Sequence, residues 1–193
     1  MGAMGNIGLQ LVTILLQLFV YILMLRFLLQ LSRADFYNPV TQSVVKATNP
    51  LVAPLQGILR PLGRFDIATL AAAFIVVSLV LVAIGALFGS GMLPVGFIAL
   101  TALGTILDSI INIYFFALIA MIILSWVAPQ ANHPGAILVH QLVDPIMKPV
   151  RKVIPSIGML DLSPIFVFIA LNLVGSLINQ TLPSLGMLRS AFS

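Results

Sequence analysis

Cysteine and glutamate are both absent from this 193-residue chain, and charged residues of any kind are scarce. The lack of cysteine excludes disulfide bonds, thiolate metal sites and cysteine nucleophiles. Charged residues make up 7% of the chain and apolar residues 61%, against about 25% and roughly 45–50% in soluble domains. A water-soluble fold of this size could not cover its surface with so few charges. We therefore expect lipid to surround most of the chain.

Long apolar runs dominate what is present. A helix needs about 20 apolar residues to cross the hydrocarbon core of a bilayer, and only helices make such a crossing while satisfying their own backbone groups. Four runs are long enough, and they cover about 7–31, 67–88, 97–127 and 164–182. The sequence predicts an all-α membrane protein with four transmembrane helices.

The basic residues predict how the chain is oriented. Seven of the nine lie in the two long connections between the runs: Arg33, Lys46, Arg60, Arg64, Lys148, Arg151 and Lys152. Cytoplasmic loops carry an excess of Lys and Arg, so we expect both long connections in the cytoplasm and both termini outside. This placement favours membrane topology over a nucleic-acid surface, and no nucleic acid is expected as a partner.

The two halves of the chain resemble each other. A shift of 95 residues superposes Pro50, Pro54, Gly63 and Asp66 on Pro145, Pro149, Gly158 and Asp161. We interpret this as two tandem repeats, residues 1–90 and 97–185. Each repeat contributes an even number of crossings, so the two are expected to be parallel.

Each repeat also carries a Pro-rich segment, 36–64 in the first and 133–159 in the second. Asn49-Pro50 and Asp144-Pro145 each offer a capping side chain followed by a proline, which is typical of a helix start. The apolar residues behind them predict a short amphipathic helix in the headgroup plane. Gly63 and Gly158 then permit a turn, after which Asp66 and Ser163-Pro164 are predicted to cap the following membrane helices.

These residues resemble the YggT family. Two copies of a helix are followed by DFYNP or ANHP, then NPLVAPL or DPIMKPV, then a Gly-x-x-Asp turn. The resemblance implies a small protein of the bacterial inner membrane built from two such repeats. It implies a connection with osmotic stress, ion homeostasis, envelope organisation or cytochrome assembly, and it carries no catalytic residues.

A few polar residues lie inside the apolar runs. Asp108, Asn112 and Gln17 form a candidate intramembrane site, because an acid in a membrane segment is costly and often functional. If Trp126 marks the inner interface, Asp108 lies near the outer one, where its charge costs little and hydrogen bonds between helices explain the group. Arg26 can either snorkel to lipid phosphates or make a structural contact.

No reaction chemistry emerges from the remaining residues. His133 and His140 could ligate haem or a metal, but no third ligand is evident, so no metal or other cofactor is expected. Nucleotide, zinc-protease and hydrolase motifs are missing from the sequence. We expect a protein that is not an enzyme.

Three interpretations of function remain open. The first is an inner-membrane scaffold or assembly factor that uses its cytoplasmic segments to contact a protein partner and anionic lipid headgroups; self-association into a homo-oligomer is a separate possibility. Its candidate contact residues are basic: Lys148, Arg151, Lys152, Arg60 and Arg64. The second is an oligomeric ion or osmolyte channel that uses the site around Asp108. The third is cofactor assembly, which would require one of the two histidines.

Overall fold

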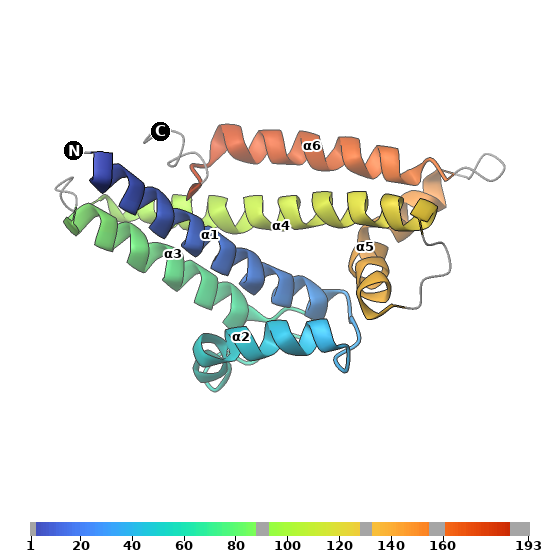
Figure 1. Cartoon of the computed structure of the whole chain (residues 1–193), viewed down its shortest axis with the longest axis horizontal. Helices are drawn as coiled ribbons and strands as arrows, with labels where there is room; N and C mark the ends of the chain where they lie inside the picture. The colour runs from blue at the N-terminus through green and yellow to red at the C-terminus, as the bar shows by residue number, and fades with distance from the viewer. Residues whose placement is uncertain (1–2, 88–92, 128–132, 155–160, 186–193) are drawn as a thin grey trace.

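The computed structural model describes residues 3–87, 93–127, 133–154 and 161–185. These ranges are helical, apart from short connections and one isolated bridge between Leu62 and Phe65. The helices are α1 (Ala3–Leu31), α2 (Pro39–Gln56), α3 (Ile67–Leu87), α4 (Val95–Val127), α5 (Pro134–Val153) and α6 (Ser163–Thr181). The predicted all-helical class is confirmed (Figure 1).

Four of the six helices are long and apolar enough to cross a membrane, as predicted. The spans are Gln10–Leu31, Ile67–Ala86, Val95–Val127 and Ser163–Thr181. α2 and α5 are different in kind, because each has a narrow buried stripe at helical spacing and is otherwise exposed or half-buried. In α2 the stripe is Thr41, Val44, Thr48 and Val52. That pattern belongs to a helix lying against a bundle.

The spanning helices pack around α4, which contacts α1, α3, α5 and α6. α1 begins and α6 ends at one end of the bundle, while α2 and α5 lie at the other (Figure 1). Within the described residues, α6 packs only on α4 and α5. Leu173 and Leu177 on α6 are therefore exposed, which suits a lipid-facing surface.

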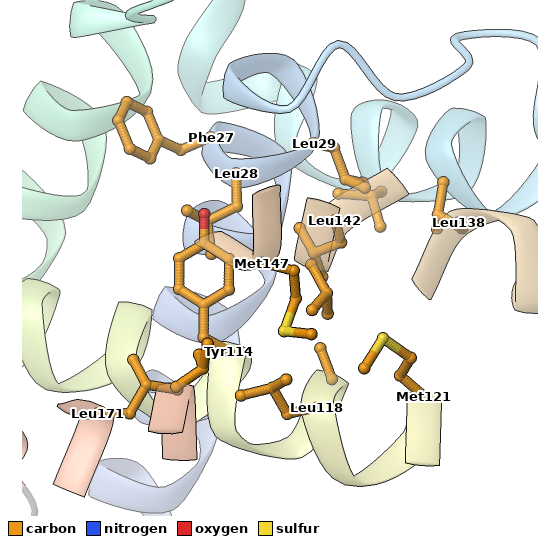
Figure 2. Packing of buried hydrophobic residues seen from close by; sticks show 14 residues of the cluster. Phe27, Leu28, Leu29, Tyr114, Leu118, Met121, Leu138, Leu142, Met147 and Leu171 are labelled. Atoms are coloured by element: carbon orange, nitrogen blue, oxygen red, sulfur yellow. The ribbon is translucent and has the colours of Figure 1, made fainter. Parts of the chain in front are cut away.

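Two apolar clusters hold the helices together. One joins α1, α2, α4, α5 and α6, and Figure 2 shows Leu142 and Met147 of α5 facing Tyr114 and Leu118 of α4. The other joins α1, α3 and α4, and it also takes in Val52 of α2. Because both amphipathic helices contribute fully buried side chains, they are part of the packed fold and not loosely attached surface segments.

Residues 182–185, which follow α6, lie close to α4. A glycine in α4 makes this close approach possible. A Cβ at Gly104 would collide with the carbonyl oxygen of Pro183. Next to it, the Oγ1 atom of Thr105 accepts a hydrogen bond from the backbone N of Leu185 at 3.0 Å, and Leu185 is fully buried. Gly104 thus allows residues 182–185 to lie directly on α4.

We expect Gly104→Ala to lower the free energy of unfolding by about 1–3 kcal/mol, the usual cost of overpacking a tight contact. Gly96→Ala is the matched control, because a Cβ there meets nothing within 4 Å and alanine favours helix. The measurement is the apparent melting temperature of both variants in detergent. Equal melting temperatures would contradict the close approach of residues 182–185.

Candidate functional site

α2 and α5 meet at the same end of the bundle (Figure 1). The Nδ2 atom of Asn38 donates to the carbonyl oxygen of Pro134 at 2.7 Å, and the backbone N of Asp35 donates to Oε1 of Gln141 at 3.0 Å. Asn38 is buried at this junction. The two halves of the chain therefore present one joined surface, which we call the platform (α2 and α5).

Both platform helices begin earlier than predicted, at Pro39 and Pro134 and not at Pro50 and Pro145. Asn38 accepts from the backbone N of Val40 at 2.9 Å, and His133 caps α5 in the same way. Each cap is followed by a proline at the first helical position, where its missing N–H costs nothing. The sequence analysis overlooked this earlier pair.

The repeated prolines consequently lie inside the helices: Pro50 and Pro54 in α2, Pro145 and Pro149 in α5. Each proline leaves a carbonyl one turn earlier without its helical partner. Residues four apart share one face of a helix, and all four prolines are exposed. Water can therefore hydrogen-bond to the freed carbonyl groups on that exposed face.

The turn before α3 follows the prediction closely. Leu62 and Phe65 exchange backbone hydrogen bonds at 3.0 Å, and Gly63 has a φ of 63°, a conformation that glycine adopts without steric cost. The Asp66 carboxylate caps α3 by accepting from the backbone N and the hydroxyl of Thr69. Gly158 lies outside the described residues.

The cap of α6 differs from the prediction. Ser163 is the first residue of the helix, and its side chain makes no cap hydrogen bond. The carboxylate of Asp161 takes that role by accepting from the backbone N of Ser163 at 2.9 Å. Asp161 therefore serves α6 as Asp66 serves α3.

The basic residues of α5 have distinct environments. Lys148 Nζ lies 2.7 Å from an Asp144 oxygen, and Arg151 Nε lies 2.9 Å from an Asp161 oxygen. Lys152 is exposed, and the described residues place no carboxylate within 4 Å of it. Arg151 thus holds α5 to the start of α6, whereas Lys152 is available to a partner.

Arg60 and Arg64 lie in the exposed connection between α2 and α3. Large apolar side chains surround them in the sequence, and Ile58, Leu62 and Phe65 are more than half exposed. Exposed apolar groups beside cations suit a segment that enters the headgroup region of a membrane.

A buried polar cluster, which the sequence analysis did not identify, connects α1, α2 and α3. Arg26 is buried, and its Nη1 atom donates to Oγ1 of Thr48 at 2.8 Å and to Oδ1 of Asn49 at 2.9 Å. Its Nε atom lies 3.9 Å from Asp66, which also accepts from Nε2 of Gln56 at 3.1 Å. Arg26 therefore makes a structural contact within the protein, which is one of the two predicted alternatives.

The second repeat neutralises its aspartate in another way. Met121 stands at the position of Arg26 and is part of an apolar cluster. Arg151 stands at the position of Gln56 and supplies the positive charge to Asp161. A cation on α1 in the first repeat is thus replaced by a cation on α5 in the second. Two features of the sequence could have predicted the ion pair in the first repeat: the charged residue at position 26 inside an apolar run, and the aspartate that occurs in both repeats.

Burial opposes ionisation of Asp161, but hydrogen bonds from Ser163 and Arg151 and the charge of Arg151 outweigh it. The pKa of Asp161 consequently lies below its ordinary value. A depressed pKa in the folded state means that the charged pair stabilises the fold above the unfolded pKa of about 3.9, and that this contribution is lost as the pH falls through the folded pKa.

We therefore expect Asp161→Asn to melt at a lower temperature than the unsubstituted protein from pH 5 to 8. The difference should shrink as the pH falls below about 4, and it should be reduced by salt because the pair is partly exposed. Asparagine still accepts the capping hydrogen bond, so the comparison isolates the charge. A difference that did not change with pH would contradict this role.

Asp108 lies in a groove of about 370 Å³ between α4 and α6. Asn112, Asn172, Ser176 and Asn179 also line the groove, and the Nδ2 atom of Asn112 donates to the backbone carbonyl oxygen of Asp108 at 2.8 Å. Asn179 lies close to the end of α6, which ends at Thr181. The carboxylate is therefore near one end of the span.

Gln17 does not line this groove. It lies on α1, one turn before Tyr21, whose side chain α1 places near Asp108. The three predicted polar residues thus come from two helices. The sequence analysis did not select Tyr21, because a tyrosine in an apolar run is common.

The two histidines do not meet. His133 caps α5 through its Nδ1 atom, which accepts from the backbone N of Gly135 at 3.2 Å. His140 is exposed on the platform. Among the described residues, no group of three or more metal-ligating side chains comes together.

Comparisons with known proteins agree with the architecture. A family model described as CCB3/YggT matches twice, at residues 5–87 and 100–182. An uncharacterized protein of Pseudomonas aeruginosa, PA0392, is 42% identical over 87% of this chain and 86% of its own length. The uncharacterized protein YggT of Escherichia coli is 31% identical over 91% of each chain. No solved structure matches the chain.

Proposed function

This chain belongs to the CCB3/YggT family, and from that premise we propose that it is a non-enzymatic scaffold of the bacterial inner membrane. The platform faces the cytoplasm and contacts a protein partner, while both termini face the periplasm. The placement of basic residues supports this orientation, because Lys46, Lys148 and Lys152 lie on the platform and Arg60 and Arg64 beside it.

The observation that carries the proposal is how the platform is built. Both helices bury one stripe in the bundle, and side-chain hydrogen bonds of Asn38 and Gln141 join the two repeats. The opposite face of α5 is exposed and mixed in character, with Ile137, His140 and Lys152 on it. A rigid, exposed helix pair of this kind is suited to binding another protein.

Site-specific photo-crosslinking in cells tests the scaffold function. A crosslinker at position 152 is expected to capture one reproducible protein, and a matched crosslinker at position 173 on the lipid-facing side of α6 is expected not to. Lys148→Glu in the same protein should abolish that capture without affecting membrane insertion. Arg151 is left unchanged in this experiment because it holds Asp161.

Two outcomes would count against the scaffold. If the crosslinker at position 152 captured only lipid, the proposal of a protein partner would be wrong. Capture of only the protein's own copies would replace the scaffold by a homo-oligomer.

The groove around Asp108 favours a second candidate function, an ion pathway in an oligomer. A carboxylate flanked by amides inside a membrane span is a reasonable cation site, and we expect Asp108→Asn to reduce potassium or proton flux into proteoliposomes at least tenfold. Lys152→Gln is the control, since it lies outside the groove. No flux through the folded, unsubstituted protein would remove this candidate.

A further inference from the structure

We propose that the cavity between α1 and α2 binds a phosphate-bearing anion at the membrane surface. The cavity has a volume of about 480 Å³, within the range of small-molecule sites. Its polar lining residues are Arg26, Gln30, Arg33, Thr41, Asn49 and Gln56. This site lies apart from the exposed face of α5 on which the proposed scaffold function depends.

The charge of the cavity is positive. Two guanidinium groups line it, and none of its lining residues is acidic. An adjoining hollow shares Asn49 with it and adds Lys46. Asp66 pairs with Arg26 at 3.9 Å, so the excess positive charge comes from Arg33 and from Lys46 beside the cavity.

Arginine is well suited to such an anion, because the planar guanidinium presents five donor hydrogens and can bind phosphate through two of them. The hydrogen bonds described for Arg26 all come from one nitrogen, Nη1. Arg26 is fixed in place by Thr48 and Asn49, so the group is already oriented before a ligand binds.

A second, independent observation comes from Thr41. Thr41 is only 5% exposed, and it lines this cavity. Its Oγ1 atom is buried and has no hydrogen-bond partner among the described residues. Buried hydroxyl groups are almost always paired. A phosphate oxygen would accept a hydrogen bond from this hydroxyl group and so provide its missing partner.

The second repeat lacks two of these polar groups. At the positions of Arg26, Thr41 and Asn49 it has Met121, Ala136 and Asp144, and Met121 packs into an apolar cluster. The corresponding helices α4 and α5 therefore pack without the guanidinium and the hydroxyl group. Pairing with Asp66 accounts for Arg26, whereas the buried hydroxyl group of Thr41 has no hydrogen-bond partner among the described residues.

Backbone geometry at Arg33 points in the same direction. Arg33 has a φ of 55°, in the left-handed region, at the position after a helix where glycine is usual. The conformation is unfavourable for a residue with a side chain. Arginine at this position thus carries some cost to stability, and its exposed side chain lines the cavity.

The test measures binding to the full-length protein in detergent by native mass spectrometry, with three probes. Inorganic phosphate represents a free anion, dioctanoylphosphatidylglycerol represents a lipid headgroup, and dioctanoylglycerol carries the same chains without phosphate. We expect a phosphate-bearing probe to bind and dioctanoylglycerol not to bind. Binding of the lipid alone would identify a headgroup site, and binding of inorganic phosphate would identify a soluble ligand.

Variants establish where the probe binds. Arg33→Gly should weaken binding about tenfold while the melting temperature stays the same or rises, because glycine adopts the observed φ freely. Thr41→Val, which keeps the shape of the side chain, should weaken it about threefold. Lys152→Gln lies outside the cavity and should have no effect.

The proposal is overturned if neither phosphate-bearing probe binds, or if dioctanoylglycerol binds equally well. It is also overturned if Lys152→Gln weakens binding as much as Arg33→Gly, since the effect would then reflect general surface charge. If Arg33→Gly failed to fold, Thr41→Val would still test the site, because unchanged binding in that variant would contradict the proposal.

Discussion

Arg26→Met is expected to destabilise the protein by about 3 kcal/mol, since removing one partner of a buried ion pair leaves the other charge uncompensated. The substitution copies the residue that the second repeat has at this position. Asp66 is fully buried, so its carboxylate would keep only the hydrogen bonds from Thr69 and Gln56. For a chain of this length we expect a fall in melting temperature of roughly 6–12 °C.

The double variant Arg26→Met with Gln56→Arg should recover much of that loss. Gln56 Nε2 lies 3.1 Å from Asp66, and Arg151 holds Asp161 from the equivalent position. The measurement is the melting temperature of the single and double variants in detergent. If Gln56→Arg gave no recovery in the Arg26→Met background, the equivalence of the two aspartate sites would be wrong.

Asn38→Ala is expected to cost about 2 kcal/mol and to loosen the contact between the repeats. The substitution removes the cap of α2, which is typically worth about 1 kcal/mol. It also removes the hydrogen bond to the Pro134 carbonyl, and the net contribution of such a bond is about 0.5–1.5 kcal/mol.

Asn38→Asp separates the two contributions of that side chain. Aspartate still accepts from the backbone N of Val40 but cannot donate to Pro134. We therefore expect an intermediate stability and, for both variants, a higher rate of proteolysis in the connection between α1 and α2. Equal stability of Asn38→Asp and the unsubstituted protein would show that the bond between the repeats contributes little.

The predictions that succeeded rest on local chemistry. The apolar runs determine the four spanning helices because a backbone in lipid must bond within its own helix. The turn at Gly63 and the cap at Asp66 follow from the short-range preferences of those two residues. Family membership likewise follows from motifs that can be read directly in the chain.

The start of the platform helices shows where local reasoning fails. Two pairs compete in the first repeat, Asn38-Pro39 and Asn49-Pro50, and each has a capping side chain followed by proline. Packing decides between them, because starting at Pro39 buries Thr41, Val44 and Thr48 in addition to Val52. The residues of the two Asn-Pro pairs do not themselves indicate which pair begins the helix.

The sequence by itself determined the class of the protein, the number of its spanning helices and the repeat that organises it. Only the tertiary structure decided that Arg26 pairs with Asp66, that Arg151 takes this role in the second repeat, and that Thr41 faces a cationic cavity. The physical reason is the range of each interaction. Hydrophobic periodicity and caps act within a few residues, whereas a buried charge finds its partner among side chains brought together from distant parts of the chain.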